Sequence, residues 1–160
     1  MNRCIFLFLL PVILLITPGQ AWAQSANKDD GYKNALGTGI DFGRGSTIVG
    51  PSFKHFFSPR HVGILDVMFG AESVVFQAGY QYHQIITGAK GLQGYIGGSV
   101  GVNLGDIDPV FFLSPMTGLD YKLPASPLSF TIDWRPRLTW NDRDIDAEPV
   151  RFGLGIRFTW

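Results

Sequence analysis

Apolar and polar residues alternate along most of the chain, and the alternation is clearest in the final segment. From residue 150 to residue 160, large apolar side chains occupy every second position, with arginine, glycine and threonine between them. A period of two is the signature of a β-strand with one apolar face. Seven earlier segments alternate in the same way, over residues 36–42, 49–57, 64–69, 76–83, 95–104, 117–123 and 128–135. The pattern therefore predicts an all-β protein with eight strands.

Eight is the smallest number of strands that closes a transmembrane β-barrel. Residues 24–160 give each strand and its connection about 17 residues, and a membrane-spanning strand uses roughly 9 to 11 of them. Short connections are expected at 58–61 and 124–127, at one end, and longer ones at 105–112 and 141–148, at the other. Three prolines fall within or beside the strands and are each expected to mark a bulge or a strand end: Pro51, Pro115 and Pro136. We therefore expect an antiparallel, up-and-down transmembrane β-barrel.

The first 23 residues differ in character from the rest. Arg3 precedes an apolar run over residues 5–16, and Ala21-Trp22-Ala23 follows a Pro-Gly break. This is the three-part pattern of a cleaved secretory signal peptide, and the run is shorter than the roughly 20 residues of a spanning helix. Residues 1–23 are thus predicted to be a signal peptide, 24–34 a flexible segment, and 35–160 a barrel domain in the outer membrane of a Gram-negative bacterium.

Charged residues of the alternating segments fall on the face opposite the large apolar side chains. If the apolar face meets lipid, the charged face lines a lumen that side chains can fill in an eight-stranded barrel. Unpaired buried charges are costly, so we predict a plug of ion pairs, with at least one close pair among Asp120, Asp133, Arg135 and Arg157. The predicted lumen charges are Asp41, Lys54, Asp66, Asp120, Lys122, Asp133, Arg135, Arg151 and Arg157.

A secreted, soluble β-sandwich that binds a ligand is the alternative fold, because its charged face would lie in water. Aromatic residues near segment ends favour the barrel, since aromatic girdles mark the two membrane interfaces. The expected girdle residues are Phe57, Tyr82, Tyr121, Trp134 and Trp140. The last strand ends in Phe158 and Trp160, which resembles the C-terminal signal that the barrel assembly machinery reads in outer-membrane proteins.

Composition narrows the range of partners and chemistry. Charged residues make up 16% of the chain, against roughly 25% in ordinary soluble domains, which suits a surface in contact with lipid. Without the first 23 residues the net charge is about −1, so nucleic acid is not an expected partner. Cys4 is the only cysteine and lies in the predicted leader, which leaves no disulfide and no thiolate site. The expected partners are outer-membrane lipid, lipopolysaccharide and the assembly machinery, and the expected state is a monomer.

Three histidines raise the possibility of a lipid-modifying enzyme, because some outer-membrane barrels are lipid A deacylases or acyltransferases that use a serine with a histidine. The alternation places His55 on the lipid face, His61 in a turn and His83 on the lumen face at a strand end. None has a serine and an acid on the same face at a matching depth. We therefore expect no catalytic residues, and keep the lipid-modifying enzyme as an alternative.

The outer connections carry acidic residues two positions apart, and Asp142, Asp144 and Asp146 resemble the start of a calcium loop. An EF-hand loop beginning at Asp142 needs glycine at its sixth position and glutamate at its twelfth. Those positions hold Ala147 and Gly153, so the motif fails. No metal site and no cofactor are expected.

Several short motifs resemble the small outer-membrane β-barrel proteins common in Bacteroidetes, most of which are uncharacterised. The most specific pieces are the Lys-His-Phe of residues 54–56 and the Asp-Trp-Arg-Pro of residues 133–136. The resemblance extends over most of residues 32–160 and implies an outer-membrane barrel of about eight strands. It implies nothing specific about activity. The further motifs are YKNALGTG (32–39), SFKHFF (52–57), YQYH (80–83), GLDYK (118–122), SFTIDWRP (129–136) and GLGIRFTW (153–160).

Overall fold

The structure is a computed structural model that describes residues 32–44, 46–105, 108–140 and 145–160, and the predicted signal peptide lies outside these ranges. The described residues form strands without any helix, so none of their elements is a helix able to cross a membrane. The strands are β1 (Asn34–Gly43), β2 (Ser46–Ser58), β3 (His61–Phe69), β4 (Val74–Ile85), β5 (Leu92–Leu104), β6 (Val110–Lys122), β7 (Leu128–Trp134), β8 (Arg137–Trp140), β9 (Ile145–Glu148) and β10 (Arg151–Thr159).

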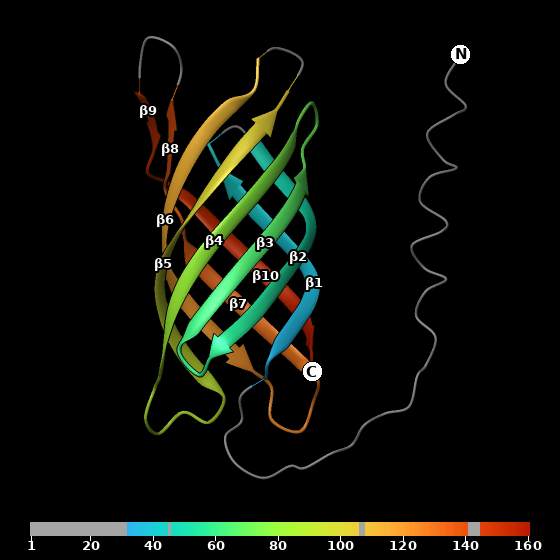
Figure 1. The fold of residues 1–160 in the computed structure, drawn as a ribbon, viewed down its shortest axis with the longest axis vertical. Coiled ribbons are helices and arrows are strands. Elements are labelled where there is room, and N and C mark those ends of the chain that lie inside the picture. Colours follow the sequence, from blue (N-terminus) through green and yellow to red (C-terminus); the bar gives the residue numbers. More distant parts are fainter. Residues whose placement is uncertain (1–31, 45, 106–107, 141–144) are drawn as a thin grey trace, which may run out of the picture.

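The strands close into an antiparallel β-barrel, as the alternation predicts (Figure 1). Each strand from β1 to β6 pairs with the next one, and β7 pairs with both β6 and β10. The pairing of β1 with β10 completes the ring. Because β7 and β8 occupy one position in the wall, and β9 and β10 the next, the barrel has eight strands rather than ten.

Two interruptions divide the last two strands. β7 and β8 pair with β6 in an unbroken register on either side of Arg135 and Pro136, so they are one strand with a gap. β9 pairs with β8, and β10 pairs with β7. The second pairing is shifted by one residue relative to the first, and the shift occurs at Pro149 and Val150. This offset places Glu148 and Arg151 three positions apart on the same side of the wall.

The prolines behave differently from one another. Pro136 follows the end of β7, as expected. Pro51 and Pro115 instead lie inside β2 and β6, where the register with one neighbour continues through them. On the other side, no pairing is made at Pro51 with β3 or at Pro115 with β7 or β8. Proline has no N–H to donate to a neighbouring strand. It is tolerated at these two positions because each of them pairs with a strand on one side only.

The barrel has two distinct ends. The turn end carries the β2–β3, β4–β5 and β6–β7 connections, and the loop end carries the others (Figure 1). At the loop end, β6 begins at Val110 and β9 spans Ile145–Glu148, so parts of the expected connections 105–112 and 141–148 are strand. β8 and β9 form a hairpin beside β6 at this end of the barrel (Figure 1).

The first described residues belong to the turn end of the barrel. The Lys33 and Asn34 amides donate to the Trp160 carbonyl, which ties the start of β1 to the end of the chain. The Tyr32 ring packs edge-on against Phe56, with ring centroids 4.8 Å apart. The last residues of the segment 24–34, predicted to be flexible, therefore form part of the barrel.

Candidate functional site

The interior of the barrel is a column of buried charges and hydrogen bonds. Inward positions on β10 are glycine where arginine side chains need room. A Cβ on Gly153 would lie 2.4 Å from Arg135 Nε, and one on Gly155 would lie 2.6 Å from Arg157 Nη1. The glycines of β10 thus leave the space that the guanidinium groups occupy in this narrow lumen. Eight of the nine predicted lumen charges are buried: Asp41, Lys54, Asp66, Asp120, Asp133, Arg135, Arg151 and Arg157.

At the turn end the column begins with Asp120, which binds two groups from the other side of the lumen. Lys54 Nζ lies 2.6 Å from Asp120 Oδ2, and the Tyr32 hydroxyl donates to the same oxygen at 2.7 Å. Burial, followed by the negative charge of Asp120, raises the pKa of Tyr32 well above its usual value. The phenol therefore stays protonated and acts as the donor that closes this end of the column.

Further along, Asp66 and Arg157 are linked through a shared serine. The Ser52 hydroxyl donates to Asp66, and Gln77 Nε2 donates to the other carboxylate oxygen at 3.0 Å. Arg157 Nη2 donates to Ser52 at 2.7 Å, and Arg157 Nη1 donates to the Thr131 hydroxyl at 2.8 Å. Asp66 and Arg157 are therefore connected through the Ser52 hydroxyl and not by a direct salt bridge.

Asp133 forms the tightest contacts of the column. Both of its oxygens accept from the Arg135 guanidinium, through Nε and, at 2.6 Å, through Nη2. The Tyr95 hydroxyl on β5 reaches past Gly118 of β6 and donates to Asp133 at 2.6 Å. A close pair among Asp120, Asp133, Arg135 and Arg157 is thereby confirmed, although it joins residues two apart on one strand and not residues on neighbouring strands.

Near the loop end, Asp41 lies between two arginines. Arg151 Nε lies 2.7 Å from Asp41 Oδ1, close enough for an ion pair although not aligned as a hydrogen bond. Arg137 Nη2 donates to Asp41 Oδ2 at 3.1 Å, and its guanidinium lies 4.1 Å from the centre of the Phe112 ring. Arg151 also donates to Glu148 Oε2 at 2.8 Å. One buried carboxylate is thus shared by two arginines, one of which has a second acid.

The composition of the column differs from the sequence expectation at three residues. Lys122 is only partly buried, and its ammonium donates to the carbonyls of Leu123 and Ser126 in the β6–β7 turn. Arg137 and Glu148 instead contribute to the column. With these changes the column contains five basic residues (Lys54, Arg135, Arg137, Arg151 and Arg157) and five acidic ones (Asp41, Asp66, Asp120, Asp133 and Glu148), so its formal charge is zero.

Apolar side chains also point inward, which the sequence analysis did not anticipate for a face described as polar and small. One buried cluster lies among Phe56, Val62, Ile64, Tyr95 and Met116, and a second among Ile48, Met68, Val75 and Phe112. β2, β3 and β4 supply most of these residues, whereas the arginines come from the strands after β6. β2, β3 and β4 therefore contribute apolar side chains beside polar ones such as Lys54 and Asp66, whereas the lumen arginines all come from the opposite part of the wall.

The outer wall is apolar around the barrel. Large hydrophobic side chains from every described strand are among its exposed residues, including Trp140 of β8 and Ile145 of β9. Phe57, Tyr121, Trp134 and Trp140 are exposed and Tyr82 is partly exposed, so the aromatic residues expected in girdles all lie on the outside. Phe158 and Trp160 are also exposed, on the outer face at the turn end.

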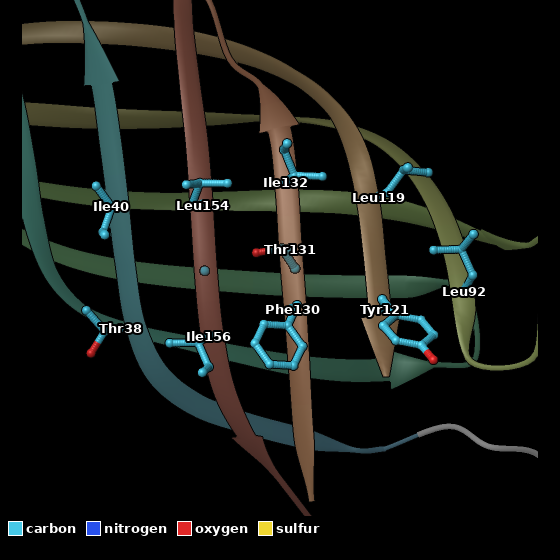
Figure 2. Close-up of a pocket in the computed structure, with 11 residues that line it drawn as sticks. Thr38, Ile40, Leu92, Leu119, Tyr121, Phe130, Thr131, Ile132, Leu154 and Ile156 are labelled. Carbon is cyan, nitrogen blue, oxygen red and sulfur yellow. The ribbon is translucent and has the colours of Figure 1, made fainter. Parts of the chain in front are cut away.

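One part of this wall is hollowed into a groove across β1, β10, β7 and β6 (Figure 2). Its volume is about 500 Å³. Two rows of side chains line it, one through Ile40, Leu154, Ile132 and Leu119 and the other through Thr38, Ile156, Phe130 and Tyr121. The lining is almost wholly apolar, and the Thr38 and Tyr121 hydroxyls are among its few polar groups.

The three histidines have partners unlike those of a hydrolase. His55 Nδ1 lies 2.7 Å from Asn34 Oδ1, on the outer face. His61 contacts the Tyr80 hydroxyl, also outside. His83 is fully buried between Gln81 and Gln93, and its ring stacks on Tyr95. Within the described residues, no histidine is hydrogen-bonded to a serine or a carboxylate.

No group of three or more histidine, cysteine or acidic side chains in the described ranges is arranged to hold a metal ion. Asp142 and Asp144 of the calcium-like motif lie outside those ranges. Comparisons with known proteins found no match to a family model, a curated protein or a solved structure. The likeness to small outer-membrane barrels of Bacteroidetes therefore rests on the sequence motifs alone, and the chain is placed by its fold as a closed, eight-stranded antiparallel β-barrel.

Proposed function

We propose that this chain is a non-enzymatic, integral outer-membrane protein, a filled barrel whose role is structural, adhesive or in surface interaction. The observation that carries the proposal is the inverted polarity of the wall. Side chains such as Phe57, Leu65 and Ile96, each more than half exposed, point outward, while the charged column is inside. Contiguous apolar surface of this extent marks an interaction surface, and one that encircles a barrel fits the hydrocarbon layer of a membrane.

A filled lumen supports a structural role over transport. The charges that would line a pore are instead paired with one another across it, as between Lys54 and Asp120. Opening a path would separate these pairs in a water-poor interior, which is costly. The function would then lie in the connections at the loop end, which we place outside the cell, where contacts with lipopolysaccharide are expected.

Membrane integration is tested by fractionation and by gel mobility. After a carbonate wash the protein should stay with the outer-membrane fraction. On a gel, the unboiled sample in detergent should migrate differently from the boiled one, because a closed barrel resists unfolding by detergent. Recovery of the protein in the soluble periplasm, with one mobility under both conditions, would contradict the proposal and favour a soluble protein.

Recognition by the barrel assembly machinery is the second part of the proposal. Phe158 and Trp160 form an exposed aromatic pair at the end of the last strand, with ring centroids 6.3 Å apart. Trp160→Ala should reduce the amount of folded barrel in the outer membrane of cells, while Phe69→Ala, at an equally exposed aromatic near the loop end, should not. Equal yields of the two variants would show that the C-terminal residue is not read as a signal.

A further inference from the structure

A compact group of polar side chains interrupts the apolar outer wall at the turn end, where β2, β3 and β4 meet. Arg60 lies in the β2–β3 turn, and its Nη1 donates to the Tyr82 hydroxyl at 3.3 Å. His61 Nδ1 contacts the Tyr80 hydroxyl, and the His61 ring packs edge-on against Tyr82, with centroids 5.5 Å apart. All four residues are exposed or partly exposed on the outside. We call this group the outer polar cluster.

The outer polar cluster holds a cation against the barrel wall at the height of the aromatic residues. An arginine in an exposed turn would ordinarily extend into water, but the bond to Tyr82 directs this guanidinium toward the outer face. A guanidinium has five N–H donors in a planar fork. No carboxylate of the described residues pairs with Arg60, and the residue is exposed, so its guanidinium is accessible to a ligand.

The surrounding charges also favour an anion. All charged residues that the structure describes in or directly beside the turn-end connections are basic: Lys33 before β1, Arg60 and Lys90 in the turns, and Lys122 at the end of β6. At the loop end, Glu72 and Asp108 lie in the described connections and Asp146 is exposed on β9, with Arg44 as the basic exception. The acids of the barrel interior are buried and already have partners. The turn end therefore attracts negative charge.

We propose that the outer polar cluster binds the phosphodiester headgroup of a phospholipid in the membrane leaflet next to the turn end. Arg60 would donate a pair of hydrogen bonds to the phosphate oxygens, the geometry that suits a guanidinium best. His61 and the two tyrosine hydroxyls would supply further polar contacts around it. This inference rests on the proposed function, because it requires the outer wall to lie in a bilayer.

The wall beside the cluster fits a lipid better than a free phosphate ion. Phe57, whose ring covers Gly63, is 69% exposed, and Leu65 on the same face of β3 is 57% exposed. These apolar side chains lie next to the cluster along the strand, where the acyl chains of a bound phospholipid would run. Burial of acyl surface adds affinity that inorganic phosphate does not have.

The experiment uses the folded protein in detergent micelles, with phosphatidylglycerol added and the bound lipid counted by native mass spectrometry. The wild type should retain phosphatidylglycerol, and Arg60→Gln should bind it about tenfold more weakly, which is the loss expected for hydrogen bonds to a charged group. The matched control is Arg44→Gln, which removes an exposed turn arginine at the loop end and should leave binding unchanged. His61→Phe, which keeps a ring but removes the imidazole, should give a smaller loss than Arg60→Gln.

The possible outcomes are distinguishable. Equal binding by the wild type and Arg60→Gln would overturn the inference, and so would an equal loss in the Arg44→Gln control. Displacement of the lipid by millimolar inorganic phosphate would also overturn it, because the site would then select a free ion. Gel mobility of each variant, boiled and unboiled, shows separately whether the barrel is intact, so failure of the lipid site is not confused with failure of the proposed membrane barrel.

Discussion

Asp133→Ala should destabilise the folded barrel by about 3–5 kcal/mol, the cost of leaving a buried charge without its partner. The Asp133 side chain is 1% exposed and that of Arg135 is 5% exposed. The substitution removes the acceptor for two guanidinium N–H groups and for the Tyr95 hydroxyl. Arg135 Nη1 already has no hydrogen-bond partner, so the arginine has no alternative acceptor in place.

Urea unfolding of the barrel refolded in lipid or detergent, followed by tryptophan fluorescence, measures the effect. With a slope of about 2 kcal/mol per molar urea, the midpoint should fall by about 2 M. Asp146→Ala is the matched control, because it removes an aspartate from an exposed position of β9. That change should cost under about 0.5 kcal/mol.

Equal midpoints for Asp133→Ala and Asp146→Ala would refute the reasoning, because the charged face would then be in contact with water. A double variant separates charge from packing. Asp133→Ala combined with Arg135→Met removes both charges, so much of the lost stability should return. If the double variant is no more stable than the single one, the loss comes from the cavity left by the side chain and not from an unpaired charge.

Gly153→Ala should destabilise the barrel by about 1–3 kcal/mol in the same urea assay, because the added methyl group would displace the Arg135 guanidinium. Gly98→Ala is the control and should be tolerated, because a Cβ at Gly98 meets only ordinary van der Waals contacts. Tyr32→Phe should cost about 1–2 kcal/mol by removing the hydrogen bond to Asp120. Because burial raises the Tyr32 pKa, this contribution is complete below about pH 10 and declines above it, so the wild type and the variant should converge in alkaline unfolding experiments; a constant gap would contradict the assigned bond.

The number and order of strands could be predicted from the sequence because apolar side chains that point outward alternate along each strand with inward ones, most of which are smaller or polar. That period survives small errors at strand ends. It also located most of the lumen charges; Asp41 and Asp66, for example, each lie between two outward apolar residues. The spacing of side chains along a strand is a local property, and the sequence carries it directly.

What the sequence could not supply was the pairing across the lumen and the effect of broken strands. Arg137 continues the alternation of Asp133 and Arg135, but Pro136 obscures it, because a proline in that position reads as the end of the strand. Glu148 could not have been assigned inward, because the one-residue offset before Arg151 is visible only in the register of the folded sheet. Lys122 keeps the correct phase but lies where the strand ends, so its side chain reaches turn carbonyls instead of the lumen.

The column of charges also bears on how the chain folds. Its contacts join the first two strands to later ones: Lys54 to Asp120, and Asp41 to Arg137 and Arg151. A partly assembled sheet that lacks the final strands leaves the early charges without partners, so it has no stable compact form of its own. Such distant contacts form only after the chain entropy of bringing them together has been lost, which favours slow, all-or-none closure. Closing the ring and neutralising its interior would thus be a single event, in which the last strand to arrive completes both.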